Sequence, residues 1–180
     1  MKRALLFLVA AMHASCTDPV RDQQIAALGD ETGEPFPEHR QGQPCLLCHS
    51  QGGPAADKSF KIAGTIFQTN EPGSPGAEGV AVELVDANGS TPNVRAITNR
   101  AGNFWITNDE WSDLAFPFRV RIVPERSPEK AEPLRMDTVV NREGSCNFCH
   151  RPFPKGPLTE GELQANRSSV GQIYVKTVTR

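Results

Sequence analysis

The middle of the chain contains short runs in which apolar and polar residues alternate. Residues 80–85 (VAVELV) and 118–123 (FRVRIV) show this period of two most clearly. Such alternation is typical of β-strands that bury one face and expose the other. Turn signals rich in Asn and Gly, at residues 86–89 and 99–103, separate neighbouring runs. The pattern predicts a mainly-β fold, with an antiparallel sandwich over residues 59–124. The expected strands are residues 60–67, 80–85, 94–98, 104–107 and 118–123.

The segments on either side of this sandwich have no sustained period. Residues 16–44 are polar and interrupted by Gly and Pro, so we expect a tether with at most a short helix. Residues 45–58 and 125–170 are expected to be irregular and partly helical. Residues 171–180 alternate again and predict a closing strand.

Residues 1–15 have the composition of a secretory signal. Two basic residues follow the initiating methionine, residues 4–12 are all apolar, and small residues lead into Cys16. The apolar run is too short for a permanent membrane-spanning helix. The junction resembles the cleavage box of bacterial lipoproteins, which implies lipidation of Cys16 and a place in the periplasm, at the outer membrane or on the cell surface. His13 stands where that box usually has Leu, so ordinary signal cleavage is the alternative.

The charge balance argues against nucleic acid as a partner. The chain has 19 basic and 21 acidic residues. Residues 1–15 hold two of the basic residues and no acidic one, so the remainder has 17 basic against 21 acidic side chains and a formal charge of −4. Nucleic-acid phosphates require clustered Lys and Arg. We expect instead a partner protein with a basic docking face.

Four of the five cysteines form two pairs of identical spacing, each followed by a histidine. The two motifs are Cys45-Leu-Leu-Cys48-His49 and Cys146-Asn-Phe-Cys149-His150. The pattern C-x-x-C-H is the attachment signature of c-type haem. Two thiols about one helical turn apart can add across the two vinyl groups of one porphyrin, and the adjacent histidine becomes the proximal iron ligand. We therefore expect two covalently bound haem c groups, one in residues 45–58 and one in residues 125–170.

The cysteines alone allow two other interpretations. A pair in an exported protein can form a disulfide or a thioredoxin-like redox pair. Two pairs can also supply four thiolates to a zinc ion. Neither interpretation requires a histidine after each pair, and two of the four histidines in the chain occupy that position.

A six-coordinate haem iron also needs a distal ligand, usually His or Met. Outside the signal and the two motifs the chain has one histidine, His39, and one methionine, Met136. We expect both to be axial ligands, and the sequence does not indicate which haem each would serve. The alternatives are an exposed loop residue for His39 and an apolar packing residue for Met136.

The sandwich segment resembles a known family. Residues 62–67 (IAGTIF), 79–86 (GVAVELVD) and 98–104 (TNRAGNF) are similar to the carboxypeptidase regulatory-like, or prealbumin-like, β-sandwich. The resemblance covers roughly residues 60–124 and implies an immunoglobulin-like sandwich scaffold. In that family the module is not catalytic, so the resemblance implies no site residue.

Together these features predict an exported dihaem c-type cytochrome that transfers electrons to and from redox partner proteins. The enzymatic alternative is a small peroxidase-like haem oxidoreductase, which would need one five-coordinate iron and acid/base groups beside it. Known dihaem peroxidases are considerably longer, with two helical haem domains. The third possibility is a β-sandwich module that binds a metal without haem.

Overall fold

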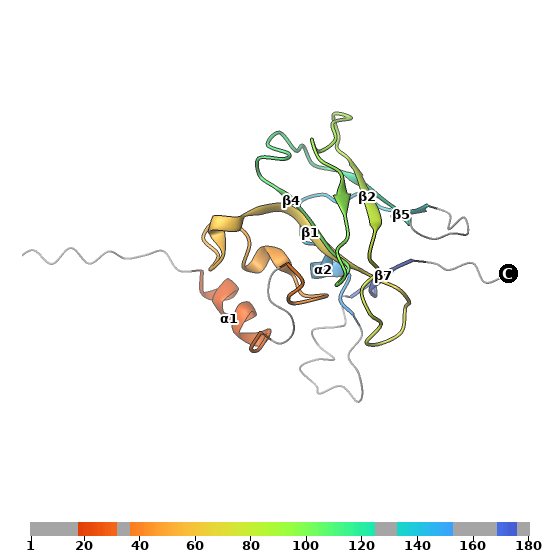
Figure 1. Ribbon diagram of the computed structural model, residues 1–180. Helices are drawn as coiled ribbons and strands as arrows, with labels where there is room; N and C mark the ends of the chain where they lie inside the picture. The colour runs from red at the N-terminus through yellow and green to blue at the C-terminus, as the bar shows by residue number, and fades with distance from the viewer. Residues whose placement is uncertain (1–17, 32–36, 125–132, 153–168, 176–180) are drawn as a thin grey trace, which may run out of the picture.

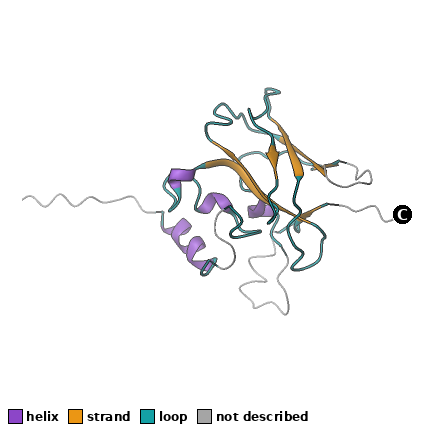
Figure 2. Ribbon diagram, in the orientation of Figure 1, coloured by secondary structure: helices purple, strands orange, loops and turns teal. Residues whose placement is uncertain are grey.

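The fold is mainly β, as the alternating pattern predicted. The computed structural model describes residues 18–31, 37–124, 133–152 and 169–175. These residues form one sheet of three strands and one of four, with a few short helices. Figure 2 shows the strands crossing the upper part of the molecule and the helices gathered on one side of them. This arrangement is that of a β-sandwich.

The three-stranded sheet has the order β4-β1-β7. Strands β1 (Phe60–Phe67) and β4 (Asn103–Thr107) pair antiparallel. The predicted closing strand exists as β7 (Ile173–Tyr174), but it pairs parallel with β1 rather than antiparallel. The reason lies in the route of the chain, because Ser145 already runs alongside Ala63 in the parallel direction and β7 continues along the same edge of β1.

The four-stranded sheet has the order β3-β2-β5-β6 and is antiparallel throughout. Its strands are β2 (Val80–Val85), β3 (Ala96–Ile97), β5 (Arg119–Pro124) and β6 (Leu134–Arg135). The sequence did not predict β6, since two residues are too few to show an alternation.

The core fills the space between the two sheets. Ile62, Ile66 and Phe104 of the first sheet meet Leu84 and Ile122 of the second in one cluster of buried side chains. Trp111, Phe104 and Phe118 are its largest fully buried members. Alternate residues of β1 and β4 therefore face the core, and the residues between them face the other side of the sheet.

The turn between β3 and β4 depends on a glycine. Gly102 has φ +75°, and a Cβ at this position would lie 2.1 Å from the carbonyl oxygen of Ile66. The side chain of Asn99 accepts hydrogen bonds from the backbone N–H groups of Ala101 and Asn103, at 3.0 Å each. The turn thus fixes where β4 begins, and Asn103 is its first residue.

The helical segments of the first 60 residues lie on the side of β1 and β4 that faces away from β2 and β5 (Figure 1), whereas Cys146, in the last helix, packs against the core cluster. Helix α1 (Pro19–Ala27) is capped by Asp18, whose carboxylate accepts hydrogen bonds from the N–H groups of Val20 and Arg21. Its first residue is Pro19, a position that proline favours. The others are the 3₁₀ turns η1 (Cys45–Leu47) and η2 (Ala56–Lys58) and helix α2 (Cys146–Cys149). Among the described residues, none of the helices has the length and hydropathy required to span a bilayer.

Candidate haem-binding sites

The first cysteine motif is folded into a single tight turn, η1. The N–H of Cys48 donates to the carbonyl of Cys45 at 3.2 Å, and the N–H of His49 donates to the same carbonyl at 2.9 Å. The chain then loops back, so that the N–H of Ala55 reaches the carbonyl of Cys48 at 3.1 Å. The turn holds two thiols and one imidazole within five residues, as attachment to one porphyrin requires.

The imidazole of His49 is held in one tautomer. Its Nδ1 lies 2.9 Å from the carbonyl oxygen of Lys58, and because a carbonyl can only accept, Nδ1 carries the hydrogen. The ring stacks on Phe60 with 4.3 Å between ring centres. Burial lowers the pKa of His49, so the ring is neutral at neutral pH. Nε2 then has the lone pair that a metal needs.

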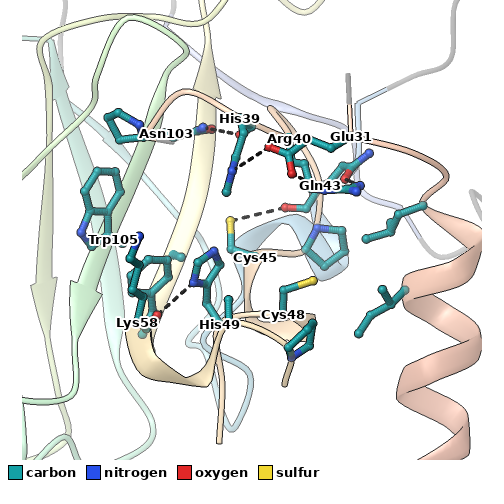
Figure 3. Close-up of a pocket in the computed structure, with 18 of the residues that line it drawn as sticks. Glu31, His39, Arg40, Gln43, Cys45, Cys48, His49, Lys58, Asn103 and Trp105 are labelled. Atoms are coloured by element: carbon teal, nitrogen blue, oxygen red, sulfur yellow. Dashed lines mark hydrogen bonds and ion pairs between the residues drawn. The ribbon is translucent and has the colours of Figure 1, made fainter. Parts of the chain in front are cut away.

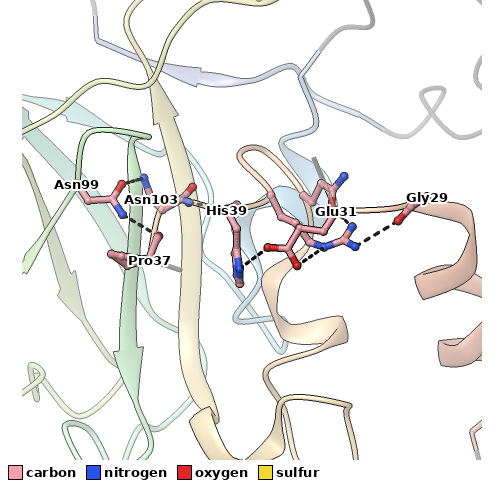
Figure 4. A network of polar contacts seen from close by, with 8 residues as sticks. Gly29, Glu31, Pro37, His39, Asn99 and Asn103 are labelled. Carbon is pink, nitrogen blue, oxygen red and sulfur yellow. Dashed lines mark hydrogen bonds and ion pairs between the residues drawn. The ribbon is translucent and has the colours of Figure 1, made fainter. Parts of the chain in front are cut away.

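A second imidazole, that of His39, faces His49 across the first cavity (Figure 3). Nδ1 of His39 lies 3.0 Å from Oε1 of Glu31. The carbonyl of His39 accepts a hydrogen bond of 2.9 Å from the side chain of Asn103, whose own carbonyl oxygen accepts one of 2.8 Å from Thr65. Figure 4 shows the contacts of His39 with Glu31 and Asn103, which tie the loop of His39 to β4 and orient the ring.

The spacing of the two imidazoles suits two ligands of one iron. Their ring centres lie 5.8 Å apart, with 36° between the ring planes. A metal–imidazole bond is about 2 Å long, so nitrogens on opposite sides of one metal are about 4 Å apart and their ring centres roughly 6 Å apart. The separation of the His39 and His49 ring centres is therefore compatible with two imidazole ligands of one metal.

The first cavity has a volume of about 400 Å³ and contains both thiols of its motif. Ile25 and Leu28 of α1 form part of its wall, and Trp105 of β4 forms another part. Residues 18–31 and 37–44, which the sequence suggested as a tether, thus supply one side of this site. Arg40 also lines the cavity and offers a positive charge for an acidic ligand group.

The second motif is built in the same way on α2. The N–H of His150 donates to the carbonyl of Cys146 at 2.9 Å. Nδ1 of His150 lies 3.0 Å from the carbonyl oxygen of Gly171, which again fixes the hydrogen on Nδ1 and the lone pair on Nε2. Gly171 has φ +86°, a conformation that glycine adopts readily. The carbonyl comes here from the segment that leads into β7.

The second cavity has a volume of about 820 Å³ and lies between β5 and β6 of one sheet and β7 of the other. Its walls are largely apolar, as expected for a cofactor site. The residues that form these walls include Val120, Ile122, Leu134, Val139, Val140, Val170 and Ile173. Met136 lines the same cavity as Cys146, Cys149 and His150 and is 37 % exposed. The fold thus brings Met136 to the second motif and His39 to the first.

Two of the three buried polar side-chain atoms without a partner among the described residues belong to residues that line the second cavity, and the third is Oδ1 of Asn147. Ser145 Oγ and Gln172 Oε1 are buried and have no hydrogen-bond partner within the described part of the chain. Both residues line the cavity, as do Arg135 and Arg142. Buried polar groups are rarely left unpaired. The apolar walls suit the body of a porphyrin, and Arg135, Arg142 and the hydroxyl of Ser145 can donate hydrogen bonds to its ionised propionates, whereas Gln172 Oε1 can only accept.

The four described cysteines are all free thiols. Burial raises the pKa of Cys45 and of Cys146 to about 12, and burial also raises the pKa of Cys48. Cys149 is exposed. Neutral, buried thiols are poor nucleophiles, so attachment to a porphyrin is favoured before the chain has folded around them.

In residues 18–31, 37–124, 133–152 and 169–175, no group of three or more His, Cys, Asp and Glu side chains could hold one ion. A structural zinc site needs four such ligands. A haem iron takes four nitrogens from its porphyrin and needs only one or two protein ligands, which is what each cavity offers.

The sequence indicated the motif residues and the two candidate ligands, His39 and Met136, which line the two cavities, but it missed the groups that position the histidines. Glu31 and Asn103 form polar contacts with His39. The carbonyls of Lys58 and Gly171 accept hydrogen bonds from His49 and His150, respectively. No sequence signal identifies these partners, because a backbone carbonyl is present at every residue. Cys16 and residues 1–15 lie outside the described residues. Comparisons of the chain with known protein families, with curated proteins and with solved structures found no match.

Proposed function

We propose that this chain is an exported dihaem c-type cytochrome that transfers electrons. One observation carries the proposal: each C-x-x-C-H histidine donates its Nδ1 hydrogen to a backbone carbonyl, at 2.9 Å for His49 and 3.0 Å for His150, inside a cavity lined by both cysteines of its motif. This hydrogen bond orients an imidazole as a metal ligand and raises its basicity. A disulfide or a thiolate zinc site would not use these histidines.

Each part of the two sites has a distinct role. The four cysteines form the covalent anchors, and His49 and His150 are the proximal ligands. When bound, haem would supply an iron that takes one electron from a reduced partner and passes it to an oxidised one. The apolar walls exclude water and leave the protein environment to set the reduction potential.

The distal ligands are the two spare residues that the fold brings to the cavities. His39, held by Glu31 and Asn103, pairs with His49 in the first cavity. Met136 pairs with His150 in the second. His39 and His49 would hold the first haem, and Met136 and His150 would hold the second. With two protein ligands for each iron, the sites would favour electron transfer over peroxidase chemistry, which requires an open coordination position.

The proposal extends to the place where the protein works. The signal-like residues 1–15 and Cys16 support export and a lipid anchor at the membrane, and export suits covalent haem. The formal charge of −4 without the signal supports docking on the basic face of a redox partner.

The decisive experiment counts covalent haem. The chain would be produced in a bacterial host with a c-type haem maturation system, and the denatured protein examined by intact mass and pyridine haemochrome spectrum. We expect a mass increase of two haems and a thioether-type spectrum. Replacing both cysteines of one motif by Ser should remove one haem, and replacing all four should remove both.

The matched control is Cys149→Ser, which should leave the second haem attached through Cys146 alone with a one-vinyl spectrum. A purified protein that contains zinc and lacks haem would overturn the proposal. Anchoring is tested separately, because wild-type protein should enter the detergent phase with the membrane fraction and Cys16→Ser should be released or remain unprocessed.

A further inference from the structure

The two attachment sites share one strand, β1. The N–H of Ala63 donates to the carbonyl of Gly144 at 3.0 Å, and Ser145 pairs with Ala63 in a parallel bridge. Ser145 directly precedes the second motif and lines the second cavity. Ala63 itself lines the first cavity. A single strand therefore separates the two cavities at this point.

Small residues make the approach of the two motifs close. A Cβ at Gly64 would lie 2.7 Å from Cβ of Cys146, so only glycine lets α2 pack against β1 here. A Cβ at Gly144 would lie 3.2 Å from Cδ2 of Leu46, which stands between the two cysteines of the first motif. The two motif segments are thus in contact, and neither could move away without opening β1.

The first cysteines of the two motifs face this shared strand. Cys45 and Cys146 are only partly accessible, whereas Cys149 is exposed. Cys45 lines the first cavity together with Ala63, and Cys146 packs against the next residue of β1, Gly64.

We propose that the two haems are neighbours across Ala63 and Gly64 and act as one coupled redox unit rather than as two independent carriers. This inference rests on the proposed function. Cys45 and Cys146 would each hold one vinyl edge of a porphyrin, and the two residues lie beside neighbouring residues of β1, Ala63 and Gly64. A change in charge at one iron would then shift the reduction potential of the other, because a buried region screens charges weakly.

The first test compares the two-haem protein with two single-haem variants, Cys45→Ser/Cys48→Ser and Cys146→Ser/Cys149→Ser. Circular dichroism in the Soret region should show a two-signed band for the wild type that disappears in both variants. The midpoint potential of the remaining haem should also shift when its neighbour is absent. A wild-type spectrum equal to the sum of the two variant spectra, with unshifted potentials, overturns the coupling.

The second test needs no variant and so remains valid if a single-haem variant fails to fold. Electron paramagnetic resonance of the fully oxidised protein is compared with that of the half-reduced protein, in which one iron is ferrous and diamagnetic. We expect the remaining ferric signal to change in line width and relaxation. An identical signal in both states overturns the inference. If two haems are attached in that case, the proposed electron carrier stands; if none is attached, the proposed function itself fails.

Discussion

The two C-x-x-C-H motifs have the same pattern but different surroundings. The imidazole of His49 donates a hydrogen bond to the carbonyl of Lys58, nine residues away within one local loop. The imidazole of His150 donates a hydrogen bond to the carbonyl of Gly171, 21 residues away at the start of the segment that leads into β7. The first cavity lies against the outer side of β1 and β4, and the second lies between the edges of the two sheets.

The comparison separates the half of each proposed haem site that depends on consecutive residues from the half that depends on the tertiary fold. The cysteines, the turn and the proximal histidine are set by five consecutive residues at both sites. The distal half comes from elsewhere in the fold and differs: His39 is held by Glu31 and Asn103, whereas Met136 lies just after the short edge strand β6 and is 37 % exposed. We expect the two haems to differ in potential and in their dependence on the fold.

The largest expected difference concerns stability. Loss of the second haem, in Cys146→Ser/Cys149→Ser, should lower the Tm more than loss of the first in Cys45→Ser/Cys48→Ser, because the second cavity is larger and several residues of its wall belong to the core cluster or pack against it. A difference of about 2 kcal/mol corresponds to roughly 4–8 °C in a chain of this size. Thermal unfolding followed by far-ultraviolet circular dichroism measures it, and equal decreases would contradict the comparison.

The second prediction separates the distal ligands by spectroscopy. Oxidised wild-type protein should show the weak near-infrared band of a thioether–iron bond, and Met136→Ala should abolish it. His39→Ala should instead convert the first haem to high spin without affecting that band. The methionine-ligated haem should titrate at the higher potential, because methionine favours the ferrous state.

One outcome would favour the enzymatic alternative. If wild-type protein lacks the near-infrared band and already contains one high-spin iron, Met136 is a packing residue and the second iron is open. Such an iron would bind cyanide or peroxide, and peroxide turnover would then need to be measured. Met136→His offers a control, since it should restore a low-spin iron without the band.

The sequence was sufficient for the parts of the molecule that depend on local pattern. Alternation predicted β1, β2, β4 and β5 to within a few residues, and spacing identified both motifs. It missed β6, and it could not predict the parallel pairing of β7, which depends on where residue 145 enters the sheet. The assignment of His39 to the first motif and Met136 to the second needed the tertiary structure, since both residues are distant from any recognisable pattern.

The third prediction concerns the chain without haem at alkaline pH. Burial raises the pKa of Cys45 and Cys146 to about 12, above the value of about 9 in an unfolded chain. The unfolded state therefore loses thiol protons first, and stability falls as the pH rises from about 9 to 12. Urea denaturation at several pH values should show this fall, and the haem-loaded protein should not, because thioethers carry no titratable proton.

Single cysteine replacements identify which thiols cause the loss of stability at alkaline pH. Cys45→Ala and Cys146→Ala should each weaken the alkaline dependence of the unmodified chain. Cys149→Ala is the matched control and should leave the dependence unchanged, because Cys149 is exposed. An unmodified chain whose urea midpoint is constant from pH 8 to 11 would show that the interior thiols are accessible to solvent.

The smallest expected effect is confined to the first site. Glu31 accepts a hydrogen bond of 3.0 Å from Nδ1 of His39, and its negative charge increases the basicity of that imidazole. A more basic ligand stabilises the ferric state, so Glu31→Gln should raise the potential of the first haem. The side chain of Glu31 is 46 % exposed, so solvent screens its charge and the rise should be on the order of 20–50 mV.

The control for Glu31→Gln removes the same charge at a position away from both cavities. Asp113→Asn does so, because Asp113 is exposed and lines neither cavity. Spectroelectrochemistry should show the rise for the first haem in Glu31→Gln and almost no change in Asp113→Asn, while the methionine-ligated haem moves less in both. If the two variants shift both haems equally, the effect is the general loss of one negative charge, and the hydrogen bond from His39 to Glu31 does not tune the site.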